Sequence, residues 1–192
     1  MYRLAIIAAI VIANAATAVV GDAPAAAMTA TDAARGCFNA TSGARALRKA
    51  LRACDTALED SRLVDTDRAA TLVNRGIVQM QANNIAAAIA DYDAAIGLVP
   101  DAAEAYVNKG IALLRLADRE ADAVEQLSQG IARNPVRPEI AYYWRAMANE
   151  TLGKNREAYE DYSRAAQLAP EWAEPAEQLL RFQTVRRKTA VG

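Results

Sequence analysis

The sequence predicts an all-α fold, an α-solenoid of stacked helical hairpins with a C-terminal capping helix. One pattern of small and large apolar residues recurs three times at a period of about 34 residues, which is typical of stacked repeats. Alanine, the strongest helix former, dominates the composition. No sustained alternation of β-branched and polar residues, the mark of a strand, occurs beyond the N-terminus.

The second helix of each repeat carries the clearest part of the pattern. A small residue is followed by a large residue four positions later, a small one three positions after that, and a proline after five more. The members are Ala88, Tyr92, Ala95 and Pro100, then Ala123, Leu127, Gly130 and Pro135, and finally Ala158, Tyr162, Ala165 and Pro170. Ahead of each set, the expected first helix has a small residue near its middle: Gly76, Gly110 or Ala146.

These residue types fit two antiparallel helices that touch closely. Helices approach each other only where small side chains meet, and residues four apart lie on the same helix face. Proline then ends the second helix, because it lacks an N–H and disfavours helix in the residue before it. One hairpin cannot bury its apolar face alone, so the sequence predicts that the hairpins stack.

The three repeats resemble those of the tetratricopeptide repeat (TPR) family, over about Ala69 to Trp172. The resemblance implies a right-handed solenoid that holds another polypeptide. The second repeat departs from the pattern: Leu127 replaces the aromatic residue, Gly130 replaces the second alanine, and its turn near Ala117–Glu120 has one extra residue. An alanine-rich helical bundle of another kind is the alternative fold.

The N-terminus has the composition of a secretory signal peptide. Arg3 precedes an apolar run, and Ala16–Ala18 forms a small-x-small cleavage site. We therefore expect an exported protein, periplasmic and soluble after cleavage; an uncleaved N-terminal membrane anchor is the alternative. The expected segments are a signal peptide (1–18), a disordered lead-in (19–31), a degenerate helical hairpin (32–64), three TPR repeats (65–172), and a capping helix and tail (173–192).

The degenerate hairpin contains both cysteines of the chain. Ala50, Cys54 and Ala57 repeat the spacing of the later second helices, with Cys54 in the place of the aromatic residue. In an oxidising compartment Cys37 and Cys54 are expected to form a disulfide, which would stabilise this terminal unit by about 3 kcal/mol. A buried pair of free thiols is the alternative.

A last helix is expected from Glu171 to Lys188. Solenoids need such a helix to cover the final exposed apolar surface. Its expected buried face consists of Ala173, Ala176, Leu179, Leu180 and Phe182.

The resemblance implies that the first helices line a concave groove that binds the partner. The groove residues are then Val73, Asn74, Ile77 and Met80, Val107, Asn108, Ile111 and Leu114, and Tyr143, Trp144 and Met147. The amides of Asn74 and Asn108 can bond the backbone of an extended peptide. The lining is mainly apolar and lacks the lysines and arginines that would grip a terminal carboxylate.

Composition argues against other classes of function. The chain has no histidine, the commonest general base and metal ligand, and its net charge of -1 gives no attraction for nucleic acid. We find no nucleophile–base pair, phosphate loop or metal-ligand spacing, and expect neither enzyme activity nor a cofactor. The carboxylates of Asp91, Asp93, Glu160 and Asp161 are expected on solvated outer faces.

The expected function is a non-catalytic protein–protein interaction scaffold of the bacterial cell envelope. Its partner would be a protein or peptide held in the groove, not a nucleic acid or a small-molecule substrate. The alternative is a self-associating structural module, a homo-oligomer whose apolar groove is the interface between copies.

Overall fold

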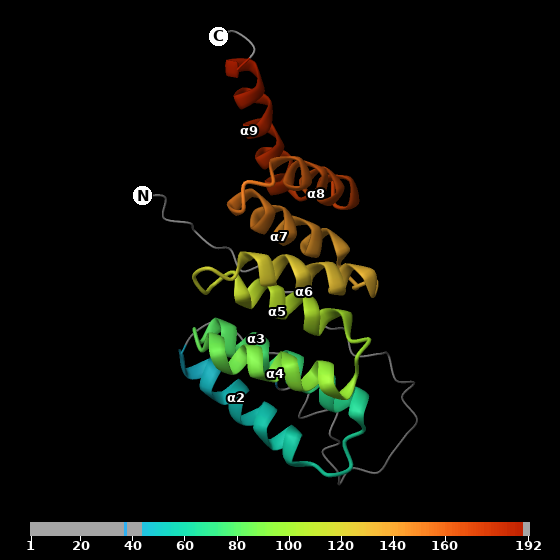
Figure 1. Ribbon diagram of the computed structural model, residues 1–192. Coiled ribbons are helices and arrows are strands. Elements are labelled where there is room, and N and C mark those ends of the chain that lie inside the picture. Colours follow the sequence, from blue (N-terminus) through green and yellow to red (C-terminus); the bar gives the residue numbers. More distant parts are fainter. Residues whose placement is uncertain (1–36, 38–43, 190–192) are drawn as a thin grey trace.

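The computed structural model describes Cys37 and residues 44–189, with side chains described at Cys37 and over 47–182. Within these residues the chain forms helices and no strand (Figure 1). The helices are α2 (Ala44–Glu59), α3 (Asp65–Gln81), α4 (Ile85–Leu98), α5 (Ala103–Leu113), α6 (Glu120–Ala132), α7 (Pro138–Thr151), α8 (Asn155–Leu168) and α9 (Ala173–Thr189). The expected signal peptide and lead-in lie outside the described residues.

The helices pair into hairpins that stack in sequence order. The closest pairs are α3 with α4, α5 with α6, and α7 with α8, and each hairpin packs on the next through α4–α5 and α6–α7. The first helices also contact one another, α3 with α5 and α5 with α7. Figure 1 shows the resulting stack, from α2 at one end to α9 at the other. The prediction of an all-α helical repeat fold is confirmed.

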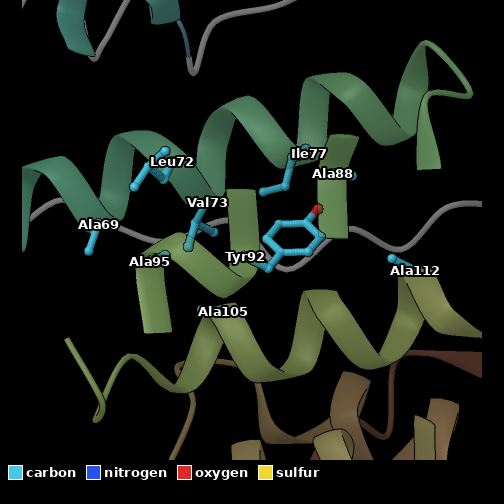
Figure 2. Packing of buried hydrophobic residues seen from close by; sticks show 9 residues of the cluster. All are labelled: Ala69, Leu72, Val73, Ile77, Ala88, Tyr92, Ala95, Ala105 and Ala112. Atoms are coloured by element: carbon cyan, nitrogen blue, oxygen red, sulfur yellow. The ribbon is translucent and has the colours of Figure 1, made fainter. Parts of the chain in front are cut away.

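Close helix contact within each hairpin depends on the small residue of the first helix. A Cβ built on Gly76 would lie 2.4 Å from Cε1 of Tyr92, and one on Gly110 would lie 2.6 Å from Cγ of Leu127. Tyr92 is fully buried among Ala69, Leu72, Val73 and other small or aliphatic residues (Figure 2). The glycine leaves the space that the large residue of the second helix fills.

The turns inside the hairpins need residues that adopt positive φ. Asn83 (φ 61°) and Gly153 (φ 73°) occupy equivalent places, directly before the second helices of their repeats. Asp118 (φ 57°) lies in the longer turn of the second repeat. Asparagine, aspartate and glycine tolerate this left-handed conformation best, which explains their presence at these turns.

The last helix is present, but its buried face differs from the expectation. Leu179 and Phe182 are partly buried and Pro175 is buried, whereas Ala173, Ala176 and Leu180 are exposed. Phe182 lies against the rings of Tyr159 and Tyr162, at centroid distances of 6.0 and 6.1 Å. The reason is geometric: α9 packs on α8 as a first helix does, but none of the described helices covers its other face.

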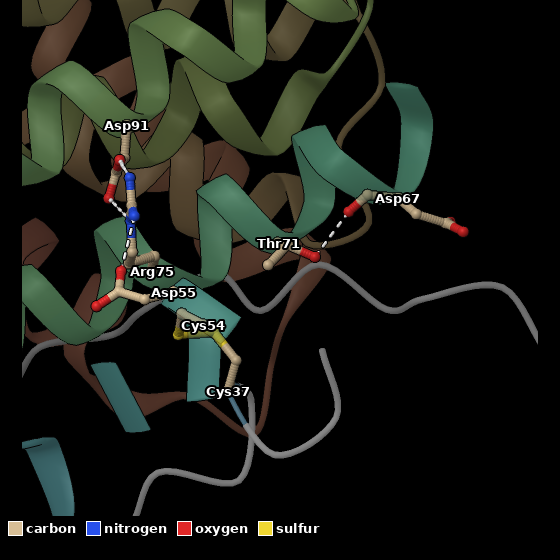
Figure 3. The surroundings of a disulfide bond; sticks show 7 residues. All are labelled: Cys37, Cys54, Asp55, Asp67, Thr71, Arg75 and Asp91. Carbon is tan, nitrogen blue, oxygen red and sulfur yellow. Dashed lines mark hydrogen bonds and ion pairs between the residues drawn. A yellow bond between two sulfur atoms is a disulfide. The ribbon is translucent and has the colours of Figure 1, made fainter. Parts of the chain in front are cut away.

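A disulfide joins Cys37 to Cys54, with an S–S distance of 2.01 Å (Figure 3). Both residues are buried, and they pack with Ala50 of α2 and Val78 of α3. The bridge therefore ties Cys37 to α2, beside Val78 of α3. In the part of the chain described here, no helix has the length and apolarity to cross a membrane.

Two glycine substitutions should change stability in opposite directions. A Cβ on Gly110 would also lie 3.2 Å from the Ala123 carbonyl oxygen, which is backbone, so Gly110→Ala should lower the free energy of unfolding by about 1–3 kcal/mol. A Cβ on Gly97 meets nothing within 4 Å. Gly97→Ala should therefore raise the free energy of unfolding by about 0.5–1 kcal/mol, because alanine favours helix. Urea unfolding followed by circular dichroism measures both; a Gly110→Ala protein as stable as Gly97→Ala would contradict the packing described.

Candidate polypeptide-binding face

The first helices bring equivalent residues of the three repeats onto one line. Asn74 on α3, Asn108 on α5 and Trp144 on α7 each lie two residues before the small residue of their helix. Because α3 contacts α5 and α5 contacts α7, these positions follow one another along the stack. The three side chains are only 8%, 3% and 5% exposed.

The fold brings the apolar groove residues together, but most of them are buried in the hydrophobic core. Val73 and Ile77 belong to one buried cluster, and Val107, Ile111 and Trp144 belong to the next. The expectation that they form an open apolar lining needs correction, because several face the second helix of their own hairpin. A Cβ on Gly130 of α6, for example, would lie 2.5 Å from Cγ2 of Val107.

Four of the groove residues remain partly exposed at the edge of these clusters. They are Met80, Leu114, Tyr143 and Met147. Met80 packs against both clusters, so it joins the surface of the first repeat to that of the second. These side chains provide a modest apolar surface beside the line of Asn74, Asn108 and Trp144.

Two polar atoms on this line are buried without a hydrogen bond. Among the described residues, the Oδ1 acceptor of Asn74 and the Nε1–H donor of Trp144 have no partner. Asn108 differs, since its Nδ2 donates to the Glu104 carbonyl oxygen at 2.9 Å. An unpaired buried polar group costs about 1–3 kcal/mol, so such groups in a folded protein call for a specific explanation.

An aromatic cluster centred on Tyr143 lies beside Trp144 at the C-terminal end of the line. The Tyr143 ring lies 4.7 Å from Trp172, 5.5 Å from Tyr162 and 5.9 Å from Trp144, measured between centroids. Burial raises the pKa of Tyr143, and the carboxylates of Glu174 and Glu150 raise it further. Its hydroxyl therefore stays neutral at physiological pH. Trp172 was missed by the sequence reasoning, although it is an aromatic residue just after the last repeat proline.

Two of the carboxylates expected on outer faces are buried instead. Asp91 and Asp161 are each 6% exposed, whereas Asp93 and Glu160 are exposed. Arg75 binds Asp91 through two hydrogen bonds of 2.9 and 2.6 Å, and Arg145 binds Asp161 in the same way at 2.8 and 2.7 Å. Hydrogen bonding to Asp91 raises the pKa of Arg75 above its usual value. The equal spacing of sixteen residues within both pairs is a signal that could have revealed them.

Arg75, Arg145 and the equivalent residue of the second repeat, Lys109, also contact the preceding helical unit. Arg75 donates to Asp55 of α2 at 2.8 Å (Figure 3), Lys109 lies 2.6 Å from Asp93 of α4, and Arg145 donates to Ser128 of α6 at 3.0 Å. Each of these contacts joins a first helix to the second helix before it. These polar residues therefore hold the stack together and are not part of the candidate binding face.

The described residues contain no cluster of three or more potential metal ligands. What the first-helix face offers chemically is a row of buried polar atoms beside apolar side chains. Stacked helical hairpins with such a face define a class of protein whose role is to bind other polypeptides.

Comparisons with known proteins agree with this class. The model of the tetratricopeptide repeat family matches residues 140–171. Tetratricopeptide repeat protein 36 of Xenopus tropicalis is 33% identical over 109 residues, which cover 55% of this chain and 54% of that protein. The chain thus spans about half the length of this curated relative. Together with the threefold pattern, these matches show that the chain is similar to tetratricopeptide repeat proteins over its repeats.

Solved structures show the same fold. MamA from Desulfovibrio magneticus RS-1 aligns with a TM-score of 0.66 at 21% identity, covering 83% of this chain and 84% of that one. The first TPR of Spaghetti (RPAP3), bound to the HSP90 peptide SRMEEVD, aligns with a TM-score of 0.60 at 25% identity. That alignment covers 66% of this chain and 99% of the other. The likeness to MamA shows the fold alone.

Proposed function

We propose that this protein is a scaffold of the cell envelope that binds an extended segment of another polypeptide across its first helices. The tetratricopeptide fold supports a protein-interaction role. The envelope location and the binding face are our inference from the residues. No step of the proposal requires catalysis.

The observation that carries the proposal is the pair of unpaired polar atoms on one line. A peptide backbone presents both a donor and an acceptor at every residue. Both atoms are buried, so a bound peptide would pair with Oδ1 of Asn74 and the indole N–H of Trp144 once the side chains that cover them move aside. A bound helix uses its own backbone groups internally, so an extended segment suits these two atoms better.

The chemistry of the surrounding side chains restricts the segment further. None of the groove residues is positively charged, and the partly exposed ones are Met80, Leu114, Tyr143 and Met147. The Spaghetti domain binds an acidic peptide, SRMEEVD. This face has no groove-residue cation to hold such charges, so we expect an internal, largely apolar segment.

The envelope location rests on the N-terminal sequence and the disulfide. The segment 1–18 has the pattern of a signal peptide, and disulfides persist in exported proteins because those compartments are oxidising. Fractionation of cells that produce the full chain tests this proposal. We expect it in the periplasmic fraction; retention in the membrane fraction would favour the anchored alternative.

The binding proposal can be tested with a peptide selected on the protein itself. A displayed library of random twelve-residue peptides is panned on the full chain, and a selected peptide is labelled for fluorescence anisotropy. Trp144→Phe removes the indole donor but keeps an aromatic ring. We expect it to weaken peptide binding about tenfold, the usual cost of one lost hydrogen bond in a desolvated site.

Trp172→Phe is the matched control, because Trp172 belongs to the same aromatic cluster but not to the polar line. It should change the dissociation constant less than about twofold, well under one hydrogen bond. Failure to select any peptide, or equal effects of the two substitutions, would overturn the proposal.

A further inference from the structure

The outward faces of the second helices share one register. The first small residue of the repeat pattern is a buried alanine in each of α2, α4 and α6: Ala50, Ala88 and Ala123. The residues two before, one before and two after each of these alanines lie mainly on the solvent-exposed side of their helix. They are Arg48, Lys49 and Arg52 on α2, Ala86, Ala87 and Ala90 on α4, and Ala121, Asp122 and Glu125 on α6. All are exposed except Asp122, which is partly buried.

The three cations of α2 differ from the arginines of the later helices, because no described residue pairs with them. Every arginine between Arg62 and Arg181 makes a hydrogen bond in the structure. No described residue pairs with Arg48, Lys49 or Arg52, although they lie within two turns of one helix face. This cationic face therefore remains uncompensated within the described chain.

Charge changes sign along the outer surface. At these register positions α2 carries three cations, α4 carries no charge, and α6 carries Asp122 and Glu125. Asp122 pairs with Arg119, whereas Glu125 has no partner among the described residues. An extended polyanion drawn to α2 would meet repulsion at α6, two hairpins along the same surface. A partner that binds this surface must therefore carry negative charge opposite α2 and positive charge opposite α6.

A second copy of this chain has that distribution. A two-fold axis parallel to α4 and between the copies would place α2 of each copy over α6 of the other. The cationic α2 positions of each copy then face the acidic α6 positions of the other, so the same contact occurs twice, as two-fold symmetry requires. The small outward residues of α4 let the two surfaces approach closely enough for the longer charged side chains to meet.

We propose that the protein self-associates as a two-fold dimer through this outer face, with Arg48, Lys49 and Arg52 of one copy against Asp122 and Glu125 of its partner. The proposal does not rest on the function of the first helices, which lie on the other side of each hairpin. Because exposed charges dominate the contact, the dimer should weaken as salt screens them.

Charge reversal tests this arrangement in the full chain. The dissociation constant of the dimer is measured by sedimentation equilibrium at about 50 mM and about 500 mM salt, where the screening length falls about threefold. Arg48→Glu/Lys49→Glu/Arg52→Glu should raise it at least tenfold at low salt, since like charges then face each other. Asp122→Lys/Glu125→Lys should have the same effect for the same reason.

The decisive experiment mixes the α2 and α6 charge-reversal variants. The α2 reversal is negative on both faces and the α6 reversal is positive on both, so neither pairs with itself but each complements the other. We expect the mixture to form a heterodimer at low salt. Lys154→Glu/Arg164→Glu, on exposed residues outside this register, should leave the dimer unchanged. A monomeric wild type at low salt, an unaffected reversal variant, or a mixture that stays monomeric would each overturn the proposal.

Discussion

Tyr92→Ala should lower the free energy of unfolding by about 3–5 kcal/mol, a large share of the total stability of a typical domain. Tyr92 is fully buried, and it fills the space that Gly76 leaves between α3 and α4. Truncation removes the ring from a close-packed site where neighbouring helices cannot fully collapse. Burial also raises the pKa of Tyr92, so the buried hydroxyl is neutral. Urea unfolding monitored by circular dichroism measures the loss.

Tyr92→Phe is the matched control for this prediction. It keeps the ring and removes only the hydroxyl, so the loss should stay below about 1.5 kcal/mol. Similar losses for the two substitutions would assign the stabilisation to the hydroxyl. A loss below about 1 kcal/mol for Tyr92→Ala would show that the hairpin does not depend on this contact.

Loss of the disulfide should cost about 3 kcal/mol. Cys37 and Cys54 are seventeen residues apart, and both are buried beside α3. The bridge restricts the unfolded chain and ties down the terminal unit, which has Cys54 in the place of the large residue of the later second helices. Cys37→Ala/Cys54→Ala should therefore unfold at lower urea concentration than the oxidised wild type.

A reducing agent provides the control for the disulfide. It should destabilise the wild type towards the level of the double variant and leave the double variant unchanged. Thiol titration of the untreated wild type under denaturing conditions should find no free thiol. Two free thiols per chain, or a double variant as stable as the wild type, would contradict a structural bridge.

The stack of hairpins was predictable because close helix contact imposes residue types at fixed positions. The recurring Gly76–Tyr92 and Gly110–Leu127 contacts are what the spacing of small and large residues indicates. Alanine and proline in the same register set the second helices and their ends. The pattern repeats because each hairpin solves the same packing problem.

The candidate face was less predictable from the same pattern. Periodicity assigns Val73 and Val107 to one side of a first helix, but it does not say whether the second helix already covers that side. The buried Asp91 and Asp161 were misjudged because a carboxylate is usually exposed unless a partner is known. The arginines that pair with them lie sixteen residues away, on another helix.

The exposed face of α9 shows a related limit. Apolar residues at helical spacing predict a buried side only when another element is available to cover it. Ala173, Ala176 and Leu180 occupy the side that a second helix covers in the complete repeats. No described helix follows α9, so these residues stay exposed.

The chain has only two tryptophans, which makes the central claim directly measurable. The two indole N–H signals are resolved by nitrogen–proton correlation spectroscopy of the full chain and assigned with Trp144→Phe and Trp172→Phe. On titration with a peptide selected on the protein, the Trp144 signal should move downfield as its unpaired N–H gains an acceptor, while the Trp172 signal moves much less. A peptide that binds without moving the Trp144 signal, or that perturbs only α4, α6 and α8, would contradict binding across the first helices.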